Sequence, residues 1–460
     1  MVGVEDLSYH RNKNTLSPSL FSLEESLAEL SSLVSTAGLT PVASLTQRLN
    51  DPNPRTYIGT GKVKEIREAC EAHETCTVVF DNELSPRQLK HLENEFGGRD
   101  LSSDKPLIKV LDRTALILDI FAQRALTREG QLQVQLALQV YRAPRLTKLW
   151  THLERQSGGN GVGLRGPGER QLEIDKRLMR DRITELKKEI DAISSHRSLH
   201  RKKRSQLNLP VVSIVGYTNA GKSTLMNLLS ASSIYADDLL FATLDPTTRR
   251  ADLGHIQAKA LAAAPPGTPP AAPISEILLT DTVGFIQKLP TTLVAAFRAT
   301  LEEVAESDVL VHVIDVSSDS WEKREQSVLD TLEEINAGGK PVVRVLNKID
   351  AVPYTENGNS GRLRAEAMML GTGEDTVAVS AKTGEGAEDF VECLRKALQG
   401  LLKDIEVVIP YSKGEDVNAI NEVGVVDKVD YRENGTYIRG KVPPALFNSL
   451  AKWAVDESSS

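Results

Sequence analysis

From about residue 22 to residue 125, the apolar positions alternate between helical and extended patterns. Four of them recur at the spacing of one helix face: Leu23, Leu27, Leu30 and Val34. Two extended apolar runs, Cys76–Phe80 and Leu107–Leu111, are separated by a polar helix candidate, Ser85–Phe96. This alternation predicts a small α/β domain over residues 20–126, preceded by a polar and irregular segment, Met1–Pro18.

The next segment, Gln131–Tyr141, gives conflicting indications. Its apolar residues alternate with period two, as in a strand: Leu132, Val134, Leu136, Leu138 and Val140. Its content of glutamine, leucine and alanine favours a helix instead. The pattern alone leaves both possibilities open.

A glycine-rich segment, Ser157–Gly168, is followed by a long stretch without glycine or proline, Glu169–Ser205. That stretch is dense in charge and has apolar residues at helical spacing: Ile183, Leu186, Ile190 and Ile193. We therefore predict one long amphipathic helix. With a helix before the glycine-rich loop, residues 127–206 would form a hairpin with that loop at its tip.

Strand, loop and helix patterns alternate over residues 210–402, which predicts a domain with a mostly parallel sheet. An alanine- and proline-rich insertion, Ala258–Pro273, interrupts it and is typical of a surface loop. The last part, residues 403–460, predicts a small α/β domain. We expect a strand at Ile405–Pro410, glycine turns, a strand pair over residues 424–442 and a helix from Pro443.

The composition is that of a globular protein with several domains. A chain of 460 residues is too long for one hydrophobic core, so two to four domains are expected. No apolar run approaches the roughly 20 residues of a membrane span, and Met1–Pro18 resembles no targeting segment. The three cysteines are too few for a disulfide framework, which fits a reducing compartment. The net charge of −8 excludes a uniformly basic nucleic-acid coat but allows a local basic patch.

Candidate chemistry begins where the buried-strand run Val211–Val215 meets the predicted helix Lys222–Leu229. Between them the chain has the loop of a phosphate-binding site, whose glycines let backbone N–H groups point at a phosphate chain. Lys222 would reach the β- and γ-phosphates, and the Ser223 hydroxyl would bind Mg²⁺. The loop residues predicted to bind the nucleotide are Gly216, Tyr217, Thr218, Asn219, Ala220, Gly221, Lys222, Ser223 and Thr224.

A second motif, DTVG, follows the apolar run Ile277–Leu279 and consists of Asp281, Thr282, Val283 and Gly284. An aspartate at a strand end can hold Mg²⁺ through water, and the glycine amide can sense the γ-phosphate. Because this motif comes after the phosphate-binding loop, it is the expected second anchor of the metal.

Two later motifs predict which base is bound. NKID closes the buried run Pro341–Leu346 and SAK follows Val377–Val379; their residues are Asn347, Lys348, Ile349 and Asp350, and Ser380, Ala381 and Lys382. The Asp350 carboxylate can accept hydrogen bonds from N1–H and the 2-amino group of guanine, a pair that adenine lacks. Backbone amides of SAK would lie near the guanine O6. The four motifs together predict a GTP-hydrolysing enzyme.

Three positions leave their roles open. Thr243, Thr247 and Thr248 compete for the switch threonine that closes over the nucleotide, and spacing does not choose among them. Phe285 stands where Ras-like enzymes have a glutamine that orients the attacking water, so hydrolysis should be slow without a partner, unless another group positions the water. Asn219 could help to coordinate K⁺ near the phosphates, or it could simply form the turn.

Over the range from about Leu23 to Lys382, the chain resembles the HflX GTPases, and the shared motifs are long enough to be specific. Besides GYTNAGKST, the motifs that carry the resemblance are PNPRTYIGTGKV (Pro52–Val63), FDNELSPRQL (Phe80–Leu89), DRTALILDIFAQRA (Asp112–Ala125), WTHLERQ (Trp150–Gln156), RGPGE (Arg165–Glu169), LFATLDPTTRR (Leu240–Arg250) and DTVGFIQKLP (Asp281–Pro290). The resemblance implies that Gln131–Tyr141 is helical. It also implies that Thr243 is the switch threonine, which joins Ser223 on Mg²⁺ and Lys222 and Gly284 in catalysis. The nucleotide-binding residues around Thr243 would be Phe241, Ala242, Leu244 and Asp245.

The same resemblance implies partners and a task. HflX GTPases bind the large ribosomal subunit, with the N-terminal domain and the glycine loop near the peptidyl transferase centre. They can split stalled ribosomes, notably under heat stress, and ribosomes stimulate their GTPase activity. We expect a monomer in the cytoplasm, or in the plastid stroma, because Ile286–Glu303 is similar to plant and algal organellar members.

Local charge is compatible with RNA contact. His196–Arg204 holds five Lys/Arg residues, two histidines and no acid, which suits a phosphate backbone. Compared with the usual pattern of the HflX GTPases, the glycine loop of this chain is slightly longer. Arg170 stands where these GTPases typically have a shorter polar residue. The predicted RNA contacts are Arg165, Arg170, Arg197, Arg201, Lys202, Lys203 and Arg204. Without the resemblance, a solvated helix face would explain the cluster equally well. A ribosome-assembly GTPase and a nucleotide-gated protein scaffold are the alternative functions.

Overall fold

The computed structural model describes the chain over residues 1–6, 21–75, 77–97, 108–146, 167–205, 209–230, 247–253, 276–288, 303–335, 337–352 and 375–454. These residues form two compact units. The first contains the described residues up to Ala192 together with Gln287 and Lys288, and the second contains the others. Within the described residues, no helix is long and apolar enough to cross a membrane.

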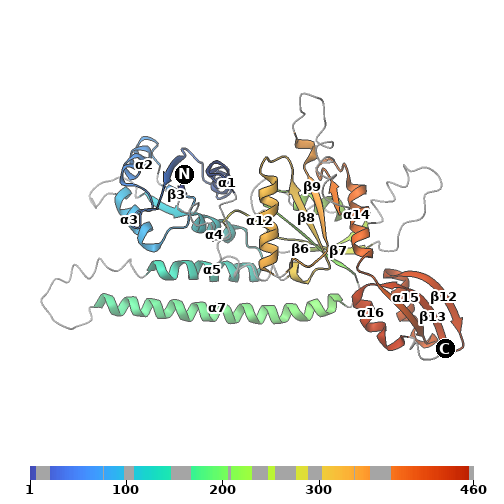
Figure 1. Ribbon diagram of the computed structural model, residues 1–460. Helices are drawn as coiled ribbons and strands as arrows, with labels where there is room; N and C mark the ends of the chain where they lie inside the picture. Colours follow the sequence, from blue (N-terminus) through green and yellow to red (C-terminus); the bar gives the residue numbers. More distant parts are fainter. Residues whose placement is uncertain are drawn as a thin grey trace, which may run out of the picture. The chain divides into compact units, whose positions relative to one another are not determined.

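The first unit is built on a four-stranded parallel sheet in the order β2-β1-β3-β4. Its strands are β1 (Val2–Asp6), β2 (Leu45–Leu49), β3 (Thr77–Phe80) and β4 (Lys109–Asp112). Its helices are α1 (Leu23–Thr36), α2 (Thr60–Ala72), α3 (Pro86–Gly97) and α4 (Arg113–Arg124). Helix α1 packs beside α4 and α2 beside α3, and Figure 1 shows the two pairs on opposite sides of the sheet. The predicted α/β fold of this region is confirmed.

The prediction of an irregular segment at Met1–Pro18 is wrong for its first residues, because Val2–Asp6 forms the inner strand β1. Val2 and Val4 are buried in the core of the sheet. Between them, a Cβ on Gly3 would lie 2.9 Å from a methyl carbon of Leu27, so α1 packs directly on the strand. Two valines are too few to show an alternating pattern, and only the sheet reveals it.

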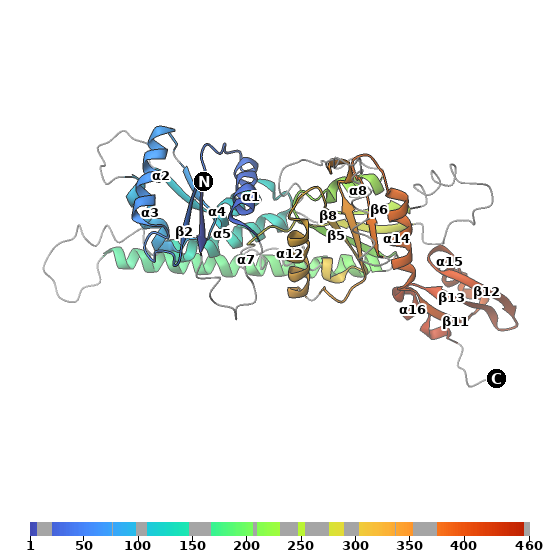
Figure 2. The same cartoon turned by 45° about the horizontal axis from the view of Figure 1, so that its top comes forward.

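Two long helices follow, α5 (Arg128–Leu146) and α7 (Pro167–Ser205). They lie side by side in both views (Figures 1 and 2), and Arg128 of α5 forms an ion pair of 3.1 Å with Glu189 of α7. Gln131–Tyr141 is thus helical, as the resemblance implied, and the long helix after the glycine-rich loop is confirmed. Helix α5 is also fixed to the sheet, since Tyr141 donates a hydrogen bond of 2.8 Å to Asp112.

The second unit holds a six-stranded sheet in the order β10-β9-β8-β5-β7-β6, in which only β6 is antiparallel. Its strands are β5 (Val211–Gly216), β6 (Thr247–Asp252), β7 (Glu276–Asp281), β8 (Val309–Asp315), β9 (Val342–Asn347) and β10 (Thr376–Ala378). Helices α8 (Lys222–Ser230), α12 (Trp321–Glu334) and α14 (Ala387–Gln399) pack on it. Helices α12 and α14 flank the sheet in both views (Figures 1 and 2). The mostly parallel sheet is confirmed.

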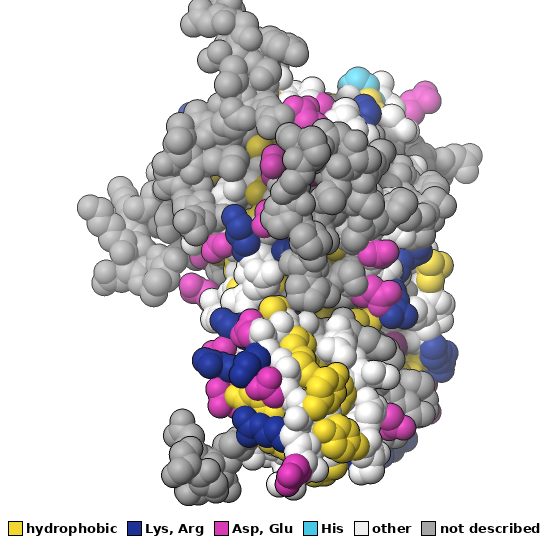
Figure 3. Space-filling model, turned by 90° about the vertical axis from the view of Figure 1, so that its right-hand side faces the viewer, with side chains coloured by type: hydrophobic (Ala, Val, Ile, Leu, Met, Phe, Trp, Pro, Cys, Tyr) yellow, Lys and Arg dark blue, Asp and Glu magenta, His cyan; other side chains and the backbone are white. Residues whose placement is uncertain are grey.

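The C-terminal part has a three-stranded antiparallel sheet, β11-β13-β12, with strands β11 (Lys403–Ile409), β12 (Val425–Arg432) and β13 (Gly435–Val442). Helices α15 (Gly414–Val423) and α16 (Pro444–Leu450) cover its core. Glycine turns were expected where α15 lies, and Ile420 shows why a helix forms: its side chain is fully buried against the sheet. Large hydrophobic side chains remain exposed at Tyr411, Val429 and Tyr431. In the lower part of Figure 3, hydrophobic side chains gather in one area beside charges of both signs.

Candidate nucleotide-binding site

The phosphate-binding loop leaves the carboxyl end of β5 and enters α8, the edge of a parallel sheet where ligands usually bind. Its backbone is left-handed at Asn219 (φ 60°) and positive at Gly216 (φ 153°) and Gly221 (φ 94°). A Cβ at Gly216 would come within 2.3 Å of the Val313 carbonyl oxygen, so only glycine fits there. The curled loop that the sequence predicted is therefore formed.

Lys222 lies at the first turn of α8 and is only 7% exposed. Its ammonium group donates hydrogen bonds of 3.1 and 2.9 Å to the carbonyl oxygens of Gly216 and Tyr217. Burial lowers the pKa of Lys222 to about 8, although the charge of Asp281 opposes the shift. A buried cation held mainly by neutral carbonyls is a favourable place for a phosphate anion.

Ser223 and Asp281 supply two oxygen ligands for a divalent cation. The Ser223 hydroxyl donates to the Asp281 carboxylate at 2.7 Å, and Asp281 is fully buried. A hydroxyl and a carboxylate fit Mg²⁺, which keeps several waters and takes its other ligands from the nucleotide. No group of three or more His, Cys, Asp or Glu residues suited to a metal occurs among the described residues.

The chain after Asp281 is tied directly to the phosphate-binding loop. The Thr218 amide donates to the Phe285 carbonyl at 2.8 Å, and the Phe285 amide donates to the Gly216 carbonyl at 3.1 Å. Gly284 is held so closely that a Cβ would lie 2.8 Å from the Thr218 Cα and 2.9 Å from the Lys222 Nζ. Its backbone thus lies beside the lysine that would meet the γ-phosphate.

The side chain of Phe285 belongs to the core of the second unit, where it is 5% exposed. A side chain so placed has no polar atom and faces apolar neighbours. It therefore packs instead of orienting water, in line with the interpretation of this position from the sequence.

The predicted base-binding motifs are locked to the loop and to each other. The Asn347 side chain donates to the Ala220 carbonyl at 2.7 Å and accepts from the Ala381 amide at 2.9 Å. The Ser380 hydroxyl donates to the Asp350 carboxylate at 2.8 Å. The four motifs, which are spread along the chain, thus meet at one edge of the sheet.

Sequence reasoning missed Asp315, whose carboxylate lies 2.9 Å from the Lys348 ammonium group. Lys348 has a left-handed backbone (φ 64°), and the ion pair holds its side chain across the end of β8. The available clue was an aspartate at the end of the strand-like run Val309–Ile314, which is apolar except for His312.

Four family profiles match the chain. They are described as "GTP-binding GTPase N-terminal" over residues 24–122, "GTP-binding GTPase Middle Region" over 124–204, "50S ribosome-binding GTPase" over 211–348 and "HflX C-terminal domain" over 367–439. A GTPase HflX of Lacrimispora saccharolytica is 41% identical over 93% of this chain and 91% of its own length. The chain belongs to the HflX family of GTPases.

Other HflX relatives are similarly close. The Escherichia coli GTPase HflX is 39% identical over 93% of this chain and 92% of its own length. Among solved structures, a GTP-binding protein of the archaeon Sulfolobus solfataricus in complex with GDP is 24% identical, with a TM-score of 0.40 over 86% of this chain and 97% of that chain. As a member of the HflX family, this chain is a GTP-hydrolysing enzyme.

Some of the predicted residues lie outside the described part of this HflX chain: Phe241, Ala242, Thr243, Leu244, Asp245 and Arg165. Arg170 and the basic residues from Arg197 to Arg204 lie in α7, of which only the backbone is described there. The competing threonines Thr247 and Thr248 lie in the edge strand β6, and the Thr248 hydroxyl is 3.1 Å from that of Thr280.

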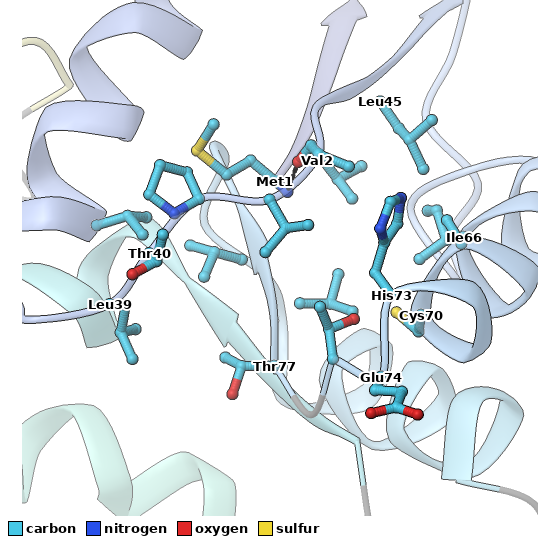
Figure 4. Close-up of a pocket in the computed structure, with 18 residues that line it drawn as sticks. Met1, Val2, Leu39, Thr40, Leu45, Ile66, Cys70, His73, Glu74 and Thr77 are labelled. Atoms are coloured by element: carbon cyan, nitrogen blue, oxygen red, sulfur yellow. Dashed lines mark hydrogen bonds between the residues drawn. The ribbon is translucent and has the colours of Figure 1, made fainter.

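A separate pocket of about 230 Å³ lies in the first unit (Figure 4). Its lining comes from residues between Met1 and Val79, among them Leu39, Ile66, Cys70 and His73, and none belongs to the nucleotide motifs. The pocket is thus unrelated to the chemistry of the GTP site.

Proposed function

We propose that this HflX protein binds GTP and Mg²⁺ at the site above, associates with the large ribosomal subunit near the peptidyl transferase centre, and separates or rescues stalled ribosomes. GTP hydrolysis would then release it. One observation carries this proposal: the profile of a 50S ribosome-binding GTPase spans residues 211–348, which include the phosphate-binding loop, DTVG and the first two residues of NKID.

In this proposal Lys222 and the Gly284 amide stabilise the γ-phosphate during transfer. Ser223 and the switch threonine Thr243 hold Mg²⁺, whose charge offsets that of the phosphates. Asp350 selects guanine, and Ala381 and its neighbours face O6. Hydrolysis is slow in the free protein because Phe285 packs in the core, and ribosome binding completes the site. Rapid turnover by the protein alone would contradict this.

Asn219 is the proposed K⁺ ligand. Its left-handed backbone suits a turn, and its side-chain carbonyl could in addition coordinate K⁺ beside the phosphates. Comparing GTP hydrolysis in K⁺ and Na⁺ at equal ionic strength separates the two roles. Equal rates would leave Asn219 as a turn residue only.

The ribosome role is tested by sedimentation in sucrose gradients with a non-hydrolysable GTP analogue. The protein should move with the large subunit, and intact ribosomes should yield separate subunits. If it stays at the top of the gradient with ribosomes intact, the proposal fails. Accumulated precursor particles after depletion would favour an assembly role, and RNase-resistant complexes would favour a protein scaffold.

The basic end of α7 allows a matched test of RNA contact. Replacing Lys202 and Lys203 with alanine should weaken co-sedimentation and reduce its salt dependence by about one unit of slope per lost phosphate contact. Replacing Lys187 and Lys188, which are exposed on the same helix, removes the same charge elsewhere and should have little effect. Equal losses from both pairs would indicate attraction without a specific contact.

A further inference from the structure

The first unit contains a cluster of buried charges that the nucleotide motifs do not include. Arg113, at the start of α4, is 2% exposed. Its guanidinium group donates to the Asp81 carboxylate at 2.7 Å and to the Glu29 carboxylate on α1. Asp81 is fully buried and Glu29 is 8% exposed. Two buried carboxylates therefore share one arginine.

The missing positive charge comes from a distant part of the sequence. The Lys288 ammonium group lies 2.5 Å from the Asp81 carboxylate, which also accepts a hydrogen bond from Ser26 at 2.7 Å. With Lys288 present, two carboxylates face two cations and the cluster is neutral. Without it, the cluster would carry a buried net negative charge, which is costly.

The preceding residue, Gln287, is bound in the same cluster through its backbone. Its amide donates to the Glu29 carboxylate at 3.1 Å, and its carbonyl accepts from Arg113 at 3.2 Å. Glu29 and Arg113 thus fix the chain at Gln287, and Asp81 fixes it at Lys288.

These two residues follow closely after the γ-phosphate motif. Phe285 is hydrogen-bonded to the phosphate-binding loop through both its amide and its carbonyl, and Gln287 is bound to Glu29 and Arg113. Only Ile286 separates the two anchored residues. Consecutive Cα atoms are about 3.8 Å apart, so a single intervening residue can take up little of a backbone displacement. A displacement of Gly284 or Phe285 should therefore also displace Gln287.

We propose that Gln287 and Lys288 are positioning residues that transmit the nucleotide state at Gly284 to the Glu29–Asp81–Arg113 cluster. The proposal rests on the GTP site proposed above. When the γ-phosphate accepts a hydrogen bond from the Gly284 amide, the backbone from Gly284 to Lys288 is displaced. This displacement changes the strength of the ion pairs by which the cluster links α1 to α4. By thermodynamic linkage, the cluster affects the relative affinities for GTP and GDP by the same factor.

The test is amide hydrogen exchange of the full chain with bound GDP or a non-hydrolysable GTP analogue. Peptides from α1 and α4, which carry Glu29 and Arg113, should exchange several-fold differently in the two states. Lys288→Met should increase their exchange in both states and remove the difference. Lys62→Met, which breaks an ion pair with Glu65 on α2 in the same unit, should leave the difference intact.

A charge-balanced double variant separates coupling from folding. Asp81→Asn with Lys288→Met leaves Arg113 and Glu29 as a neutral pair, so protection of α1 and α4 should recover while the nucleotide-dependent difference stays absent. If Lys288→Met alone does not fold, the exchange of α1 and α4 is compared between the double variant and the unmodified chain. A difference that persists in the double variant, or that is absent in the unmodified chain with both nucleotides bound, would overturn the inference. Failure to bind either nucleotide would instead refute the proposed GTP site.

Discussion

Asp81 and Lys222 are both buried charged groups, but their surroundings differ. Burial acts to raise the pKa of Asp81, yet the charges of Arg113 and Lys288 and the hydrogen bonds from Lys288 and Ser26 hold it below its ordinary value. Burial lowers the pKa of Lys222 to about 8, and only the charge of Asp281 opposes it. Neighbouring groups of the chain thus fully compensate the cost of burying the Asp81 charge, but they only partly compensate the cost of burying the Lys222 charge.

This difference separates a structural cluster from a ligand site. Around Asp81 the charges are balanced by the protein, so the cluster can stabilise the fold without any ligand. At Lys222 the partners are two carbonyl oxygens and a nearby carboxylate that also accepts from Ser223. Perturbed groups of the second kind are typical of functional sites, since the ligand completes their surroundings.

The largest expected effect comes from breaking the balanced cluster. Arg113→Met leaves two buried carboxylates with Lys288 alone, and removing one partner of a buried ion pair costs about 3–5 kcal/mol. Exchange of α1 and α4 amides in urea measures the loss. The control is Arg48→Met, whose side chain is 78% exposed and pairs with Glu5, and it should cost about 1 kcal/mol or less. Similar losses in both variants would mean that the cluster contributes no more than a surface pair.

The next largest effect is expected on GTP hydrolysis at the phosphate-binding site around Lys222. Gly284→Ala introduces a Cβ that would clash with the Thr218 Cα and the Lys222 Nζ, so the Gly284 amide must move. Losing one aligned donor to developing charge lowers kcat on the order of 100-fold. Single-turnover GTP hydrolysis is the measurement. Gly339→Ala is the control, because nothing lies within 4 Å of its added Cβ; unchanged hydrolysis in Gly284→Ala would remove Gly284 from the site.

A smaller change is expected at the base. Asp350→Asn should reduce GTP affinity by about 1.5–3 kcal/mol, the usual contribution of a hydrogen bond to a charged group. The same amide can donate to the 2-oxo group of xanthine, so xanthosine triphosphate should bind better than GTP. Competition with a fluorescent guanine nucleotide measures both. Asp319→Asn, at an exposed position of the same unit, should leave the order of affinities unchanged, and no change in Asp350→Asn would contradict the assignment.

The smallest effect is a pH dependence of GDP affinity. In the free protein Lys222 loses its proton as the pH rises above about 8, whereas bound phosphates favour the charged form and raise this pKa. Binding therefore takes up a proton above pH 8, and affinity falls by at most about tenfold per pH unit. Calorimetry in buffers of different ionisation enthalpy measures the uptake, which should fade toward about pH 7 as the free lysine becomes protonated. Proton uptake that does not depend on pH would show that Lys222 is not the group that takes up the proton. The cost of burying its charge would then be offset by the chain even without a nucleotide.

The motifs of the GTP site were predictable because phosphate and base recognition require particular residues in short loops. Gln131–Tyr141 was harder, because its buried helix face includes polar residues: Gln133 donates to Glu129 one turn earlier at 3.2 Å. With polar side chains on that face, the apolar positions no longer follow the helical period. The short strand β1 and helix α15 were missed because tertiary packing, not local propensity, stabilises them.

By itself the sequence determined the order of the nucleotide motifs, the preference for guanine and the family, since each depends on residues close together in the chain. The tertiary structure decided which charges are balanced. Lys288 and Asp81 are separated by 207 positions, and no local pattern connects them. Folding buries Asp81 completely, where an unbalanced charge is costly, and brings Lys288 beside it, although the Lys288 side chain remains 41% exposed.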